Sequence, residues 1–117
     1  KINIKKLEGI IHPIVRAEMK KFLIKNKDKK FVFLEIPLLI ESKLYKKFNL
    51  IFFIKAKRSI RLKRFISKGG TKKFFQALNK KQLPDVKKIK FCDHIIVNEN
   101  KIEILKKNLL GIFDKYV

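Results

Sequence analysis

The sequence predicts an α/β fold built around a parallel sheet. Three short, almost continuously apolar segments have the length and composition of buried strands. They alternate with segments in which apolar residues recur at three- and four-residue steps, as in amphipathic helices. Strands that alternate with helices form parallel β-α-β units with right-handed crossovers. With 117 residues and 46% apolar content, the chain is large enough for one domain with a real core.

The first half of the chain is predicted to hold a long helix, a strand and a short helix. Residues 4–25 have helical spacing, and Pro13 is expected either to kink this helix or to begin a new one. After a polar turn, residues 31–36 form the first predicted strand. Residues 38–47 have the length and spacing of a short helix.

The second half is predicted to hold two strands, with helices between and after them. The strands are residues 50–54 and 93–97. A basic helix at about 57–68 ends at Gly69 and Gly70, because glycine accepts the left-handed conformation at a helix C-terminus. The other predicted helices cover residues 72–82, 84–91 and 101–116.

The net charge of +21 would suit a nucleic acid or an anionic membrane surface as partner. Only four of the 31 basic residues are arginines, and the lysines are scattered along every segment, as on a solvated surface. The phenylalanines follow core periodicities and do not form an exposed stacking surface. We therefore expect neither a nucleic acid nor a membrane as partner, and a small basic RNA-associated module is the alternative.

Other bulk features indicate a cytoplasmic protein without a disulfide. The apolar stretches are far shorter than the roughly 20 residues of a membrane span, and the first residues show no signal-peptide pattern. A single cysteine, Cys92, excludes an internal disulfide and a multi-cysteine zinc site, so a buried thiol is expected.

Candidate functional residues follow the predicted strands, because ligands of open parallel sheets bind beyond the strands' carboxyl ends. Residues 35–41, residues 55–64 and Asn98 occupy such positions. Glu35 and Glu41 flank a strand–proline–helix junction, where carboxylates can hold Mg²⁺ through water or accept from substrate hydroxyls. A surface or capping role is at least as compatible with this pattern.

Arginines are concentrated after the second predicted strand. Arg58, Arg61 and Arg64 lie within seven residues, and steps of three and four align Arg61, Arg64 and Lys68 on one helical side. The planar guanidinium matches phosphate oxygens, so this cluster indicates a phosphate-facing role, with a solvated helix face as the alternative.

His12 and Arg16 form a third candidate cluster on the first predicted helix. Their four-residue spacing puts an imidazole and a guanidinium on one helical face. A single His on a helix is more often a packing or hydrogen-bonding residue than a catalyst.

These 117 residues contain no phosphate-binding P-loop. The motif G-x-x-x-x-G-K-[ST] cradles phosphates with backbone amides, and its lysine reaches the outer ones. The glycine pair is followed here by Thr71, Lys72 and Lys73, in the wrong order and after a predicted helix. No dinucleotide-binding glycine motif, zinc spacing or Ser/His/Asp order stands out either.

Five segments in sequence carry a recognisable pattern. They are Leu7–Arg16 (L-x-x-I-x-H-P-x-V-R), Phe33–Ser42 (D/E-x-P-L-L-x-E), Arg61–Arg64 (R-L), Gln82–Pro84 (Q-x-P) and Cys92–Asn98 (A-D-x-V-I-x-N). In this order, over nearly the whole chain, they resemble the bacterial dephospho-CoA kinase family. Another P-loop nucleotide or nucleoside kinase is the neighbouring alternative.

The resemblance implies a partial P-loop NTPase fold of the nucleoside-monophosphate-kinase type, with three layers around a parallel sheet. Residues 1–117 would be the C-terminal part of one kinase domain. Its implied parts are a helical CoA-binding side with a core strand (about 4–48), lid-like helices (about 66–84) and the core (50–56 and 93–117). The implied reaction transfers the γ-phosphoryl group of ATP, with Mg²⁺, to the 3′-hydroxyl of dephospho-CoA, the last step of coenzyme A biosynthesis.

The resemblance also implies roles for residues. Arg64, helped by Arg61, would neutralise charge on the transferring phosphate, while Lys68 and Asn98 would contact the nucleotide. The substrate-binding residues on the acceptor side would be His12, Arg16, Glu35, Pro37, Leu38, Leu39 and Glu41. No residue is implied as a metal ligand.

Two departures from the family pattern have consequences. Leu78 stands where the family commonly has an arginine, four residues before the Gln of Q-x-P. The family's P-loop, and the aspartate thought to activate the acceptor hydroxyl, belong to an N-terminal stretch that these residues do not contain. In the family sheet the P-loop strand lies between those corresponding to residues 31–36 and 50–54. We therefore expect residues 1–117 alone to be inactive and poorly soluble or dimeric, and the parent enzyme to be a monomer.

Overall fold

The computed structural model describes residues 4–117, and the chain divides into two compact units, Lys1–Ile36 and Pro37–Val117. The first unit contains helix α1 (Ile4–Lys25). This helix runs through Pro13 without a second start, so the alternative of a new helix beginning at the proline is wrong. Asn26 ends it, since its backbone N–H and its side-chain amide both donate to the carbonyl of Phe22, at 3.1 and 2.8 Å.

The segment 31–36 is extended but is not a strand, which corrects the sequence prediction. Its apolar composition favours the extended conformation, yet a strand also needs a neighbour for its backbone donors and acceptors. Among the residues that the structure describes, the sheet pairs only two other segments, so residues 31–36 have no ladder partner.

The second unit opens with a turn where the sequence predicts a helix over residues 38–47. Leu38 and Lys43 have left-handed backbone conformations, with φ of 54° and 63°, which an α-helix does not accommodate. The chain closes a tight turn between them, with the N–H of Ser42 donating to the carbonyl of Leu38 at 2.9 Å. Only a short 3₁₀ helix, η1 (Leu44–Lys47), follows.

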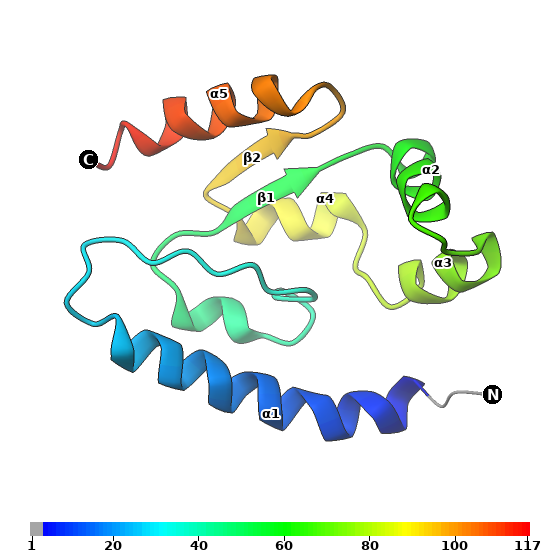
Figure 1. Ribbon diagram of the computed structural model, residues 1–117, viewed down its shortest axis with the longest axis horizontal. Helices are drawn as coiled ribbons and strands as arrows, with labels where there is room; N and C mark the ends of the chain where they lie inside the picture. Colours follow the sequence, from blue (N-terminus) through cyan, green and yellow to red (C-terminus); the bar gives the residue numbers. More distant parts are fainter. Residues whose placement is uncertain (1–3) are drawn as a thin grey trace. The chain divides into compact units, whose positions relative to one another are not determined.

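The sheet consists of two parallel strands, β1 (Phe52–Lys55) and β2 (His94–Val97), which Figure 1 shows side by side and pointing the same way. Phe52 pairs with His94, and the register continues to Lys55 and Val97. Asp93 fixes this register at the amino ends, because its carboxylate accepts from the N–H of Ile51 at 2.8 Å while its own N–H donates to the carbonyl of Ile51. Ile96, at 2% exposed, is the centre of this small core.

The strand prediction for residues 50–54 is therefore displaced by a residue or two, and that for residues 93–97 is nearly exact in its bounds. Helices connect and follow the two strands. These are α2 (Arg58–Ser67), α3 (Lys72–Asn79), α4 (Asp85–Lys88), the 3₁₀ helix η2 (Ile89–Phe91) and α5 (Ile102–Phe113). The helix predicted over residues 72–82 ends three residues early, and that over residues 84–91 is split into α4 and η2. Helix α5 packs against β2.

The predicted α/β class with parallel strands is thus confirmed for this small sheet. The parallel direction matters for function, since it brings the carboxyl ends of β1 and β2 to the same edge. None of the helices in residues 4–117 combines the length and apolar content that crossing a lipid bilayer requires.

Candidate functional site

The segments that follow β1 and β2 are joined at the carboxyl edge of the sheet. The N–H of Asn98 donates to the carbonyl of Lys55 at 2.7 Å, which extends the parallel ladder by one bond. The carboxylate of Glu99 accepts from the N–H of Lys57 at 2.8 Å, just before α2 begins. A carboxylate at this position satisfies a free donor of the helix and is favoured by the helix dipole.

Arg64 and Asn98, two residues singled out from the sequence, are in contact. The Nη1 of Arg64 donates to the backbone carbonyl of Asn98 at 2.7 Å. This half-buried guanidinium therefore ties α2 to the loop after β2. Lys68 lies exposed at the C-terminal end of α2.

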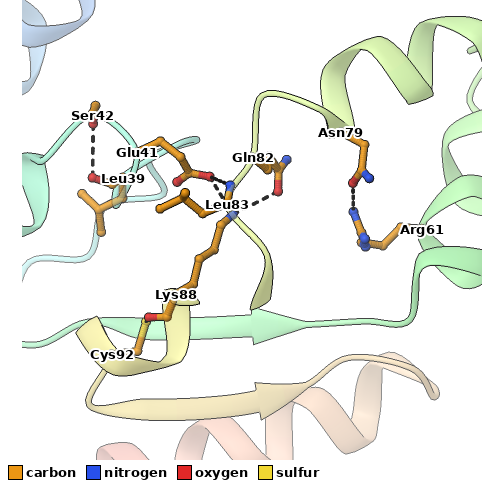
Figure 2. A network of polar contacts seen from close by, with 9 residues as sticks. All are labelled: Leu39, Glu41, Ser42, Arg61, Asn79, Gln82, Leu83, Lys88 and Cys92. Atoms are coloured by element: carbon orange, nitrogen blue, oxygen red, sulfur yellow. Dashed lines mark hydrogen bonds and ion pairs between the residues drawn. The ribbon is translucent and has the colours of Figure 1, made fainter. Parts of the chain in front are cut away.

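Arg61 connects the end of β1 to the end of α3. Its Nε donates to the carbonyl of Ala56 at 3.1 Å, and its Nη1 donates to the side-chain oxygen of Asn79 at 3.0 Å (Figure 2). The guanidinium carbons of Arg58 and Arg61 lie 5.4 and 5.7 Å from the ring centre of Phe75, which is buried. These two arginines are thus held in place by the helices that carry them.

A cavity of about 410 Å³ lies beside these arginines. One wall is the stretch from Lys55 to Arg58 together with Arg61, and the other is formed by Asn79 and the stretch from Gln82 to Val86. Lys55, Lys57, Arg58 and Arg61 give the lining four cationic side chains, against the one carboxylate of Asp85. Such a lining attracts an anionic ligand.

Glu41 lies in the turn at the start of the second unit and faces the same wall. Its Oε2 accepts from the N–H of Leu83 and pairs with the ammonium of Lys88, both at 3.0 Å, as Figure 2 shows. Of the other residues of this turn, Pro37 is exposed, while Leu38 and Leu39 are half-buried.

The remaining sequence-predicted residues belong to the first unit. His12 and Arg16 are exposed and one helical turn apart on α1, as their spacing predicts. Glu35 is exposed in the extended segment.

Sequence reasoning missed Asn79, Leu83 and Lys88. Their partners are Arg61, 18 residues away, and Glu41, 42 residues from Leu83, so no local spacing announces these contacts. The available signal was the resemblance of Gln82–Pro84 to a family motif, which marks the segment without showing what it contacts.

Metal binding finds no ready-made site here. Within residues 4–117, no three His, Cys, Asp or Glu side chains come together in a group that could hold an ion. The thiol of Cys92 donates a hydrogen bond to the carbonyl of Lys88 at 3.2 Å.

The fold and this cavity define an α/β protein with a cationic ligand site beyond the carboxyl ends of parallel strands. Sequence comparison makes the class specific. The family model described as "Dephospho-CoA kinase" matches residues 2–103. The chain belongs to the dephospho-CoA kinase family, which confirms the resemblance seen in its five segments.

Individual relatives agree with the family match. A dephospho-CoA kinase of Agrobacterium fabrum is 29% identical over 116 residues, covering 97% of this chain and 60% of the relative. The enzyme of that name from Bartonella quintana is 34% identical over 111 residues, covering 92% and 57%. One from Prochlorococcus marinus is 37% identical over 109 residues, covering 92% and 50%. The chain therefore spans only 50 to 60% of the length of these relatives.

Proposed function

We propose that the protein carrying this chain is an ATP-dependent kinase that phosphorylates the 3′-hydroxyl of dephospho-CoA to give coenzyme A. Family membership supports the reaction, and the names of the relatives supply the substrate. The observation that carries the proposal is the cationic cavity beyond the carboxyl ends of β1 and β2, where parallel α/β folds bind ligands. The proposal includes a P-loop kinase fold, of which residues 1–117 are one part, so the activity is that of the whole protein.

Arginines of α2 would supply the positive charge that phosphoryl transfer needs. Charge spreads over the oxygens of the transferring group, and preorganised cations lower the barrier without reorganising during the reaction. Arg61 lines the cavity, and Arg64 is fixed beside the Asn98 loop. We assign charge neutralisation to both, assisted by Lys68, and a position beside the nucleotide to Asn98.

The acceptor side is proposed to involve residues of both units. His12, Arg16 and Glu35 are exposed and available to a ligand, and the turn Pro37–Leu39 belongs to the unit that holds the cavity. ATP would enter with Mg²⁺, which usually keeps several waters and binds through substrate phosphates. Residues 4–117 form no cluster to hold that ion, so no step is assigned to a metal bound by them.

The reaction can be tested on the complete gene product that contains residues 1–117. Incubation with ATP, Mg²⁺ and dephospho-CoA is expected to release ADP and yield coenzyme A, identified by mass spectrometry. Arg64→Met should lower kcat by about a hundredfold or more, as loss of a preorganised charge does. Lys63→Met removes a charge from the neighbouring exposed position of α2 and should leave kcat close to wild type.

Failure would take distinct forms. Absence of coenzyme A with the wild type would overturn the proposed reaction, and normal turnover by Arg64→Met would overturn the role of that residue alone. Binding to RNA that weakens steeply with salt, without turnover of dephospho-CoA, would favour a basic RNA-associated protein instead.

A further inference from the structure

The carboxylate of Glu41 holds the segment between α3 and α4 at two points. Oε2 accepts from the backbone N–H of Leu83 and pairs with the ammonium of Lys88, each at 3.0 Å. The same ammonium donates to the side-chain oxygen of Gln82 at 3.0 Å. One oxygen of Glu41 and one nitrogen of Lys88 thus fix the course of the chain from Gln82 to the end of α4 (Figure 2).

This ion pair differs from a surface salt bridge because it is almost buried. The side chains of Lys88 and Glu41 are only 13% and 12% exposed. In such surroundings the pair is weakly screened, and removing one partner leaves the other charge without compensation. The ammonium also lies 5.9 Å from the ring centre of Phe53, which connects the pair to strand β1.

The segment held in this way is a wall of the cationic cavity. Gln82, Leu83 and Pro84 line it opposite Lys55–Arg58 and Arg61. A second tie, from Arg61 to Asn79, holds the start of the same segment. The distance between the two walls is therefore set at one end by Arg61 and at the other by Glu41 and Lys88.

We propose that Glu41 and Lys88 are positioning residues, which act on the reaction by fixing Gln82–Pro84 as a preformed wall for a phosphate-bearing substrate. This inference rests on the proposed function and deepens it. It also gives Glu41 a different task from the direct substrate contact expected from the sequence, since its carboxylate is engaged by Leu83 and Lys88. A wall that must be ordered on binding costs affinity, so loss of the pair raises KM more than it lowers kcat.

The test uses the complete gene product with four variants. Lys88→Met and Glu41→Leu each remove one partner. The double variant Glu41→Leu/Lys88→Met replaces the buried pair by apolar groups of similar size, which is often neutral for stability but leaves the N–H of Leu83 without its acceptor. Lys88→Arg keeps the charge. Lys87→Met, on the same short helix but exposed, is the matched control for charge alone.

The double variant is expected to melt near the wild-type temperature, yet to show a KM raised about ten- to a hundredfold for one substrate, with a smaller change in kcat. Its effect should be close to that of the more severe single variant, because the two residues act as a unit. Lys88→Arg should restore most of the affinity, and Lys87→Met should have a wild-type KM. Hydrogen exchange of the Leu83 amide should be faster in the double variant than in the wild type.

Two results would overturn the inference: a folded double variant with wild-type KM, or an equal KM increase in Lys87→Met. If the wild type does not phosphorylate dephospho-CoA, the proposed function fails. The exchange rate of the Leu83 amide then still decides whether Glu41 and Lys88 hold this segment. Unchanged exchange would remove the structural basis of the inference as well.

Discussion

The thiol of Cys92 is less acidic than an ordinary cysteine. Burial raises the pKa of the Cys92 thiol, the charge of Asp93 raises it further, and the ammonium of Lys88 offsets part of the change. The hydrogen bond that the thiol donates to the carbonyl of Lys88 also favours the protonated form. The expectation of a thiol in a protected setting, drawn from the sequence, agrees with this geometry.

Alkylation of Cys92 is therefore expected to be slow. Because only the thiolate reacts, a raised pKa lowers the reactive fraction at any pH below it and moves the rate profile to higher pH. Reaction with iodoacetamide at about pH 8, followed by mass spectrometry, should be slower in the folded protein than in urea, where an ordinary cysteine titrates near 8.5. Equal rates in the two states, after correction for the effect of urea on the reagent, would contradict this prediction.

Among the secondary-structure elements, the end of α2 shows why two glycines stand together. Gly69 has a left-handed φ of 94°, and the N–H groups of Gly69 and Gly70 donate to the carbonyls of Ile66 and Phe65, each at 3.0 Å. This is the Schellman arrangement, which satisfies carbonyls left free at a helix end. The ring of Phe65 lies over Gly70, where a Cβ atom would come within 1.9 Å of it.

Gly70→Ala is consequently expected to displace the Phe65 ring from its contacts with Phe74 and Phe75. Such overpacking should lower the free energy of unfolding by about 1 to 3 kcal/mol, measured by urea denaturation of the complete gene product. Gly111→Ala is the matched control, because a Cβ there meets nothing within 4 Å and α5 gains helix propensity. That control should raise stability by about 0.5 to 1 kcal/mol. A Gly70→Ala protein as stable as the wild type would show that the ring moves without cost.

The elements with strong local signals could be predicted from the sequence. Helix α1 has regular apolar spacing, and α2 has an arginine-rich face followed by a glycine pair, so both appear close to their predicted bounds. The parallel direction of β1 and β2 followed from the helices between them. Residues 31–36 differ, because composition shows that a segment prefers to be extended but cannot show whether a neighbouring strand exists.

The candidate site divides in the same way. Arg61 and Arg64 stood out because arginine is rare in this lysine-rich chain, and the cavity indeed lies against Arg61. The engagement of Glu41 by Leu83 and Lys88 could not be predicted, since it joins segments more than forty residues apart through a turn with left-handed residues. Local patterns carry no information on such a contact.

At the scale of the whole molecule, both units expose apolar side chains that a finished core would cover. On α1, the exposed fractions of Ile10 and Ile14 are both 60%, and in the sheet Ile54 and Ile95 are 45% and 43% exposed. Within residues 4–117 the sheet has two strands, so each has one edge without a strand partner. Isolated exposed apolar residues are ordinary, but a row of them on one helix together with open strand edges indicates a surface that associates.

Residues 1–117, prepared alone, are therefore expected to self-associate, whereas the complete gene product should be a monomer. The chain matches relatives that are considerably longer, and the rest of such a protein is a natural cover for these surfaces. Sedimentation velocity over a range of concentrations would measure this directly, with dimers or larger species expected for residues 1–117 and one species for the complete protein. Association should persist at high salt, because it depends on apolar area, whereas association through the many lysines would weaken as their charges are screened. A monomeric 117-residue chain with a sharp, cooperative melt would contradict the prediction, since it would mean that these residues close a core of their own.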